Sequence, residues 1–404
     1  MSNTNTNLNR RDFIRNSTGF LSASALTGLF GDGLWNLRGV SDDRVLVIVQ
    51  LSGGNDGLSM VVPYGDDAYS NARRRARVDM DGLHKIDNHV ALNADLKGLS
   101  SLYRDGKMSI IQGVSYPKAT RSHFKSMDIW HAGDLRGSIE PYGWVGRFCD
   151  RSFKDNTNPN LIVSIGNKTP RAVSGRLKKP VALSSPDAYR YVAEDREKMR
   201  FPKVNDAEGK KESSLDFIRR TSREARKSSV EIRKAVERHQ TSENYGVRGL
   251  ANDLKMAASI ICSNIGTRVL YVTMGGFDTH NNQKNRHAQL MQQLDQGLTA
   301  FQKDLAAHGM AKNVTTMVFS EFGRRVKENA SGGTDHGRAG PSLILGDSVK
   351  GGLYGKHPSL TDLDKGDLKM TTDFRGIYAT LIEKWMGGSA RPVLKGQYQS
   401  PKFI

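Results

Sequence analysis

The sequence predicts an α/β fold in which a mostly parallel central sheet is sandwiched by helices. Short, near-continuous apolar runs such as RVLVIVQL (44–51) recur along the chain, as is typical of parallel strands covered on both faces. Amphipathic stretches of helical length separate these runs, which is the strand–helix–strand order of α/β proteins. Several runs end abruptly in glycines and polar residues, where such sheets place their ligand sites.

The first 40 residues predict an export signal. Arg10 and Arg11 precede an Asp-Phe-Ile sequence and a weakly apolar run (19–30), which is the pattern of a twin-arginine (Tat) signal. That run is too short, and too rich in Ser, Thr and Gly, to span a bilayer. We therefore expect a signal and linker at 1–40, then a single domain at 41–404 that is periplasmic or extracellular and not transmembrane after processing.

The chain is strongly basic, with 404 residues, a formal net charge of +18 and a pI near 9.8. Such a charge favours anionic partners, among them phosphate or sulfate esters and acidic glycans. The basic residues are scattered, and no zinc-finger or RNA-binding signature occurs, so nucleic acid is not expected. The two cysteines, Cys149 and Cys262, favour isolated thiols over a disulfide.

The expected elements follow from the periodicity of the apolar residues. Strands are expected at 44–51, 108–114, 161–165, 268–274, 314–319 and 341–345. Helices are expected at 93–104, 122–131, 143–149, 247–264, 285–308 and 373–385, and a loop at 351–355.

Residues 194–240 differ from the rest because they are charged and poor in large apolar residues. We expect a charged helical insertion here, with a helix over 214–239. Its lysines and arginines are interspersed with acidic residues, so a solvated face is favoured over a polyanion site. The narrow buried side of this helix is expected to consist of Leu215, Ile218, Val230, Ile232 and Val236.

Polar clusters follow the ends of three predicted strands. The loops read SGGNDG after 44–51, GGFDTH after 268–274, and SEFGR with a later GGTDHG after 314–319. Each cluster alone is equally consistent with an ordinary capped turn. Because the carboxyl ends of parallel strands share one edge, we expect their side chains to form one metal or acid/base site. The candidate ligands are Asn55, Asp56, Asp278, His280, Glu321, Asp335 and His336.

Ser122 lies where the predicted helix 122–131 begins. Its hydroxyl suits an N-cap, which is the commoner role of such a serine. The same position suits a nucleophile, because a helix N-terminus stabilises negative charge and Arg121 and His123 stand beside it. Arg121, Ser122 and His123 are therefore the candidate catalytic residues.

Taken together, the motifs resemble one family. The set comprises the twin-arginine start, LSGGNDGLSMVVPYG, RSHFKSMDIW, GGFDTHNNQ, SEFGR and GGTDHG, within a resemblance that covers 44–385. It is similar to the exported bacterial proteins grouped as domain of unknown function 1501. That family in turn resembles the alkaline phosphatase and sulfatase superfamily, which implies a mostly parallel sheet between helix layers.

The superfamily resemblance also implies roles for single residues. The metal carboxylate of the first strand falls on Asp56, with Asn55 as the neighbouring alternative. The nucleophile falls on Ser122, with Thr120 as the alternative. Asp278 and His280 resemble an Asp and a His that hold a metal after a later strand.

The later motifs depart from the superfamily pattern. Glu321 stands where an Asp is common, Phe322 stands where a metal-binding His is common, and His336 resembles the late His. Phenylalanine binds no metal, so one divalent ion is expected rather than two. Oxygen donors suit calcium or magnesium and imidazoles favour zinc or manganese, so the identity of the ion stays open.

Two functions are consistent with these residues. One is metal-assisted hydrolysis of a phosphate or sulfate ester, with Ser122 as nucleophile and Arg121, Arg324 or Arg338 binding the anion. The other is a non-catalytic envelope protein that binds an anionic glycan or a partner, because a lost metal position can turn an enzyme fold into a binder.

Overall fold

The computed structural model describes residues 43–190, 200–201, 205, 214–247 and 249–404. The predicted export signal at 1–40 lies outside these residues, as does part of the predicted insertion. Asp42–Ile404 forms one compact unit. None of the helices in the described ranges combines the length and apolarity that a membrane crossing requires.

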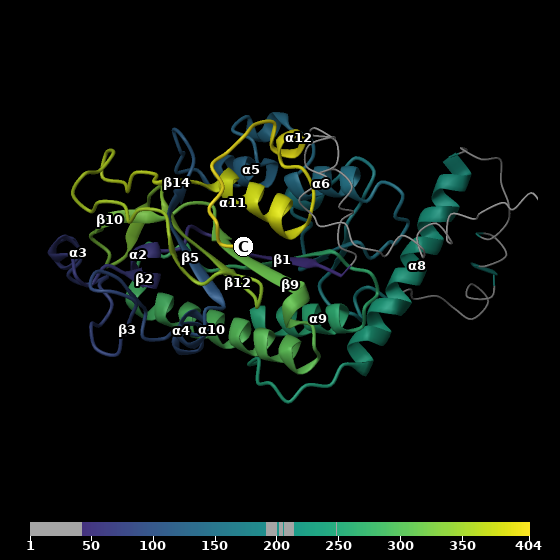
Figure 1. Ribbon diagram of the computed structural model, residues 1–404, viewed down its shortest axis with the longest axis horizontal. Helices are drawn as coiled ribbons and strands as arrows, with labels where there is room; N and C mark the ends of the chain where they lie inside the picture. The colour runs from purple at the N-terminus through teal and green to yellow at the C-terminus, as the bar shows by residue number, and fades with distance from the viewer. Residues whose placement is uncertain (1–42, 191–199, 202–204, 206–213, 248) are drawn as a thin grey trace, which may run out of the picture. The chain divides into compact units, whose positions relative to one another are not determined.

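A nine-stranded sheet forms the centre of this unit (Figure 1). Its strands lie in the order β13–β5–β12–β9–β1–β8–β6–β7, and β14 pairs with β5. Only β12 runs antiparallel to its neighbours, and every other pairing is parallel. The predicted mostly parallel sheet is thus confirmed. The strands are β1 (Val45–Leu51), β5 (Met108–Ser115), β6 (Ile162–Ile165), β7 (Val181–Leu183), β8 (Val269–Met274), β9 (Val314–Ser320), β12 (Gly340–Leu345), β13 (Gly352–Tyr354) and β14 (Thr372–Asp373).

Helices cover both faces of the sheet (Figure 1). One face carries α4 (Lys97–Arg104), α9 (Leu250–Cys262) and α10 (Gln283–Ala307). The other carries α5 (His123–Ala132), α6 (Trp144–Ser152), α11 (Phe374–Thr380), which continues as a π-helical turn (Leu381–Trp385), and α12 (Arg391–Leu394). The sandwich of helices around the sheet is therefore confirmed.

The smaller elements lie in the connections between these layers. They are α2 (Gly57–Met60), α3 (Asp67–Ala72), the three-stranded sheet β2 (Val61–Val62), β4 (Ala91–Leu92) and β3 (His84–Lys85), the hairpin β10 (Arg324–Glu328) and β11 (Thr334–His336), and 3₁₀ turns at Gly137–Ile139, Arg171–Val173 and Ala311–Asn313.

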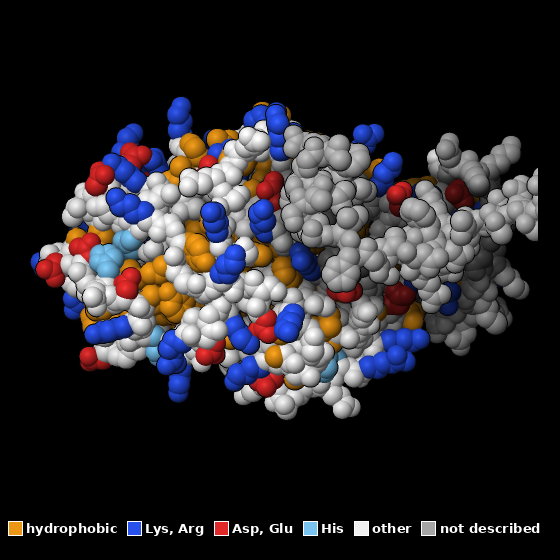
Figure 2. Space-filling model, in the orientation of Figure 1, with side chains coloured by type: hydrophobic (Ala, Val, Ile, Leu, Met, Phe, Trp, Pro, Cys, Tyr) orange, Lys and Arg blue, Asp and Glu red, His pale blue; other side chains and the backbone are white. Residues whose placement is uncertain are grey.

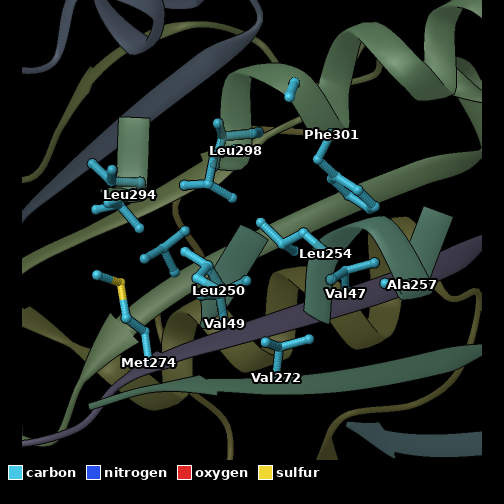
Figure 3. Packing of buried hydrophobic residues seen from close by; sticks show 14 of the residues in the cluster. Val47, Val49, Leu250, Leu254, Ala257, Val272, Met274, Leu294, Leu298 and Phe301 are labelled. Atoms are coloured by element: carbon cyan, nitrogen blue, oxygen red, sulfur yellow. The ribbon is translucent and has the colours of Figure 1, made fainter. Parts of the chain in front are cut away.

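The core on the first face joins β1 and β8 to α9 and α10 (Figure 3). Alternate residues of a strand point to the same face, so Val47 and Val49 of β1 face this layer. Residues at helical spacing on α9 and α10 meet them. The labelled helical residues are Leu250, Leu254, Ala257, Leu294, Leu298 and Phe301, all of which are buried.

The opposite face is held by aromatic stacking. Trp130 of α5 lies between Phe319 of β9, with ring centroids 4.8 Å apart, and Phe374 of α11, at 4.4 Å. Offset aromatic contacts of this kind add stability beyond the area that they bury. This stack fixes α5 over the end of β9, next to the polar loop that follows that strand.

The helix α8 (Ser214–Arg238) corrects one prediction. Ile232 is fully buried, but Leu215 is 53% exposed and Ile218 is 57% exposed. The expected buried side is therefore wrong for the first half of the helix, because the buried residues described in α8, Ser228, Ser229, Ile232 and Ala235, all lie in its second half. The predicted loop at 351–355 is also wrong in part, since β13 forms there by pairing with β5 at the edge of the sheet.

The surface carries its positive charge in a dispersed form. Lys and Arg side chains are spread over the face seen in Figure 2, with Asp and Glu side chains among them. This agrees with the scattered pattern of the sequence and offers no single basic patch on that face.

Candidate metal centre

Three polar loops leave the same edge of the sheet. β1 lies between β8 and β9 and is parallel to both, so the loops that follow Leu51, Met274 and Ser320 start side by side. The hairpin of β10 and β11 returns to this edge, where Arg324 pairs with His336. This is the edge at which open α/β sheets place their sites.

Four side chains converge at this edge, and we call them the His₃–Asp cluster: His123, Asp278, His280 and His336. His336 Nε2 lies 3.1 Å from His123 Nε2, 3.0 Å from His280 Nε2 and 3.0 Å from Asp278 Oδ1. Asp278 Oδ1 is also 3.0 Å from His280 Nε2, and Asp278 Oδ2 is 3.7 Å from His123 Nε2. The ligand atoms of His123, Asp278 and His336 thus lie within 4.8 Å of one another, whereas His280 lies at the edge of the cluster, in contact with His336 and Asp278.

The spacing of the ligand atoms of His123, Asp278 and His336 fits a bound divalent metal. Ligands placed 2.0–2.1 Å from a tetrahedral zinc ion lie roughly 3.3 Å from one another. Hydrogen bonds alone do not account for the cluster. The nitrogen of His336 faces two other imidazole nitrogens and a carboxylate, and it can donate at most one proton.

The outer nitrogen of each histidine has an acceptor. His123 Nδ1 lies 2.8 Å from Glu321 Oε1, and His336 Nδ1 lies 3.0 Å from the carbonyl oxygen of Arg121. His280 Nδ1 lies 3.4 Å from Asp335 Oδ1. A proton on each Nδ1 satisfies these acceptors and leaves each Nε2 lone pair facing the cluster. Metal-binding histidines are held in this way by carboxylates and backbone carbonyls.

The pKa values of the cluster side chains shift in different directions. Partial burial raises the pKa of Asp278, but its hydrogen bonds with Arg324 and His336 outweigh this effect and lower the pKa to about 2. The hydrogen bond to Glu321 raises the pKa of His123, whereas burial lowers the pKa of His336. The four side chains are 24–48% exposed, so the site is open to solvent.

A buried arginine fixes the carboxylate of the cluster. The Arg324 side chain is fully buried and donates from Nη2 to Asp278 Oδ1 at 2.7 Å. Its Nε donates to the carbonyl of Gly54 at 2.6 Å and its Nη1 to that of Thr334 at 2.8 Å. The guanidinium of Arg324 is therefore occupied by hydrogen bonds within the protein. It is not available to bind an anion, contrary to one prediction from the sequence.

Phe322 supplies the apolar floor of the cluster. Its buried ring lies 4.8 Å from the ring of His123 and 5.0 Å from that of His336, measured between centroids. Gly54 approaches the other side of this ring with a φ of +74°, and a Cβ there would lie 2.3 Å from a ring carbon. Glycine is required at this position by both the backbone angle and the contact.

Asn55 and Asp56 are not brought into the cluster. Asp56 is fully buried and accepts hydrogen bonds from both Nη atoms of Arg73, at 2.5 and 2.9 Å, and from Gln283 at 2.5 Å. Burial opposes the shift, but the charge of Arg73 lowers the pKa of Asp56. Asn55 Oδ1 lies 2.9 Å from His287 Nε2. Arg73 thus provides the positive charge beside Asp56, and nothing in the local sequence pointed to it.

The other predicted residues surround the cluster. Glu321 and Asp335 contact the outer nitrogens of His123 and His280 and so support ligands. His123, grouped with the catalytic residues in the sequence, lies among the candidate ligands. Ser122 caps α5, and its Oγ accepts from the backbone N–H of Lys125 at 3.5 Å.

The two remaining predicted anion-binding arginines are both paired. Arg121 Nη2 lies 2.7 Å from Asp367 Oδ2, and a third of the Arg121 side chain is exposed. Arg338 pairs with Asp364 and Asp367. Arg121 also contacts the cluster, because its backbone carbonyl oxygen accepts a hydrogen bond from His336 Nδ1.

A model of the family described as "Protein of unknown function (DUF1501)" matches residues 167–391, more than half of the 404-residue chain. The chain belongs to the DUF1501 family. Among curated proteins, none matches the sequence of this DUF1501 protein.

Solved structures similar to this DUF1501 protein include three proteins of low sequence identity. The C-terminal periplasmic domain of EcEptC from Escherichia coli, in complex with Zn, has a TM-score of 0.40 and 11% identity over 86% of this chain and 83% of that one. A protein in the alkaline phosphatase superfamily from Vibrio parahaemolyticus has a TM-score of 0.40 and 9% identity over 88% and 70%. The PsFucS1 sulfatase from Pseudoalteromonas sp. has a TM-score of 0.37 and 10% identity over 86% and 68%. At these scores, the likeness carries no conclusion about activity.

Proposed function

We propose that this DUF1501 protein is a metal-dependent hydrolase of phosphate or sulfate esters that acts outside the cytoplasm. The observation that supports this proposal best is the His₃–Asp cluster, in which His123, Asp278 and His336 present ligand atoms within 4.8 Å of one another at a solvent-exposed edge of the sheet. The twin-arginine pattern at Arg10 and Arg11 supports export.

The donor set favours a single zinc ion. Imidazole nitrogens suit zinc or manganese, whereas calcium and magnesium prefer oxygen ligands throughout. A second ion at Asp56 is disfavoured, because that carboxylate is buried and already neutralised by Arg73. His123, Asp278 and His336 would therefore hold one ion, with His280 beside them.

The residues of the chain would act around that ion. A bound divalent ion supplies positive charge that polarises the ester oxygens and lowers the pKa of an adjacent hydroxyl group. Ser122 is the neighbour of His123, and among the described residues its hydroxyl makes one hydrogen bond, the long contact with the backbone N–H of Lys125, which a substrate could replace. Its position at the N-terminus of α5 favours an anion.

The reaction would proceed in two displacements. Ser122 Oγ loses its proton to solvent and forms a bond to phosphorus or sulfur, while the bond to the leaving oxygen breaks and that oxygen takes a proton from solvent. Water then cleaves the seryl ester and regenerates the hydroxyl. Arg121, held by Asp367 and partly exposed, would bind the anionic group.

The first experiment is metal analysis of the purified protein and of its His336→Ala and Asp278→Ala variants, with His84→Ala as the control. Each cluster variant should lose one equivalent of metal relative to wild type, while His84→Ala keeps it, because His84 contacts only the carbonyl of Ala94 among the hydrogen bonds of the described residues. If wild type and both cluster variants bind the same amount of metal after zinc or manganese is supplied, the hydrolase proposal is rejected.

The second experiment screens phosphate and sulfate esters with chromogenic leaving groups. Turnover should fall to background in Ser122→Ala and His336→Ala. The metal of the His₃–Asp cluster should be retained in Ser122→Ala and lost in His336→Ala. Turnover that survives in Ser122→Ala would remove this residue as nucleophile. Binding of an anionic glycan that survives both chelation and Ser122→Ala would support the non-catalytic alternative.

A further inference from the structure

A second cluster of metal-binding side chains lies away from the His₃–Asp cluster. His239, Cys262 and His308 each present one ligand atom, and the three atoms lie within 4.8 Å of one another. Cys262 ends α9, which leads into the start of β8, and His308 follows α10, which leads into the start of β9. The cluster therefore lies at the amino edge of the sheet, opposite the His₃–Asp cluster.

One buried residue, Asp304, contacts both imidazoles. Asp304 of α10 is fully buried, and its Oδ2 lies 2.9 Å from His239 Nε2. His308 Nδ1 lies 2.9 Å from the backbone carbonyl oxygen of Asp304, its hydrogen-bond partner, and 3.1 Å from Asp304 Oδ1. The ring centroids of the two histidines are 4.7 Å apart. A carboxylate that orients imidazoles beside a thiol is the arrangement that accompanies zinc sites.

The state of Asp304 is an independent sign that a cation belongs here. The hydroxyl of Tyr245 donates to Oδ2 at 2.6 Å, but Oδ1 has no hydrogen bond of acceptable geometry among the described residues. In that part of the chain, its ion-pair partners are the two histidines alone. A buried carboxylate oxygen without a hydrogen bond is costly, and a nearby positive charge compensates it.

We propose that His239, Cys262 and His308, supported by Asp304, bind a structural zinc ion. A thiolate with two imidazoles selects zinc over calcium and magnesium, which prefer oxygen ligands. Cys262 is a free thiol and partly buried, and His308 is exposed, so an ion can reach the site from solvent.

The ion would join three parts of the chain. His239 directly follows α8, Cys262 ends α9, and His308 directly follows α10. The second half of α8 packs on the core through Ile232, whereas its first half exposes Leu215 and Ile218. Zinc at this point would fasten the charged helix where it returns to the core.

The test uses cobalt(II) in the full-length protein, because a cobalt–thiolate bond gives a near-ultraviolet charge-transfer band. The His₃–Asp cluster contains no cysteine, so the band reports this second site alone. We expect the band in wild type and in His336→Ala. We expect its loss in Cys262→Ser, together with the loss of one equivalent of bound metal, while the buried, free Cys149→Ser control keeps both.

Two further measurements separate loss of the metal from misfolding of the Cys262→Ser variant. His308→Ala changes an exposed side chain and should weaken the cobalt band without loss of secondary structure. Chelation of zinc from wild type should raise amide hydrogen exchange over residues 232–245 to the level of Cys262→Ser. A cobalt-loaded wild type without a thiolate band, or a band that persists in Cys262→Ser, would overturn the proposal.

Discussion

At the scale of single residues, the candidate metal centre depends on side chains that are not candidate ligands themselves but hold the candidate ligands in place. Glu321 is buried, and its Oε1 accepts from His123 Nδ1 at 2.8 Å and from the backbone N–H of Gly53 at 2.9 Å. It thus holds a candidate ligand and the glycine loop together. Outer partners of this kind tune both the orientation and the basicity of a metal-binding imidazole.

Glu321→Gln should weaken metal binding about 10- to 100-fold, because it removes the negative charge beside His123 while keeping the side-chain volume. Competition with a chromophoric chelator measures this affinity. The exposed Glu237 of α8 provides the control, and Glu237→Gln should bind the metal as wild type does. Equal affinities in the two variants would show that Glu321 does not support the site.

At the same scale, the sequence pointed to the right loops but not to every partner. Asp278, His280 and His336 come together as expected from their strand ends. Asp56 does not join them, because Arg73 and Gln283 hold it in a buried network. The direction in which a loop side chain points depends on distant residues, and no local pattern reports it.

At the scale of elements, α8 divides into two halves with different environments. Ile232 belongs to the main core cluster and is fully buried, whereas Ile218 is more than half exposed. Both residues occupy apolar positions of one amphipathic pattern, so periodicity alone treats them alike. The buried residues described in α8 all lie in its second half, which is the half that packs on the core.

Ile232→Ala should lower the free energy of unfolding by about 2–5 kcal/mol, as large-to-small changes in a packed core do. Ile218→Ala is the matched control, and it should change stability by less than about 0.5 kcal/mol. Urea unfolding followed by circular dichroism measures both. Similar effects of the two substitutions would contradict the packing of α8 described above.

At the scale of the whole molecule, buried histidines make the fold sensitive to acid. Burial lowers the pKa of His287 from 6.5 to about 4, and burial lowers the pKa of His131 to about 3. Below pH 6.5 the unfolded chain binds a proton at each position, whereas the folded chain stays neutral down to the lower value. Acid therefore favours unfolding over this range.

The free energy of unfolding should fall between pH 6.5 and pH 4, and His287 alone accounts for about 3 kcal/mol of this loss. Urea titrations of the chelated protein at several pH values measure the slope without a contribution from metal. His287→Gln should flatten the slope, whereas His84→Gln, at a less buried position, should leave it unchanged. A wild-type protein equally stable at pH 4 and pH 6.5 would contradict the burial of these rings.

Most of the strands and helices along the chain, and the edge at which the polar loops emerge, could be predicted because hydrophobic periodicity and glycine-rich strand ends are local signals. The full membership of each candidate metal-binding cluster could not be predicted. His123 meets His336 across 213 residues of chain, and His239 meets Asp304 across 65. Such encounters arise only when the sheet and its helix layers pack, since packing decides which side chains share a point in space.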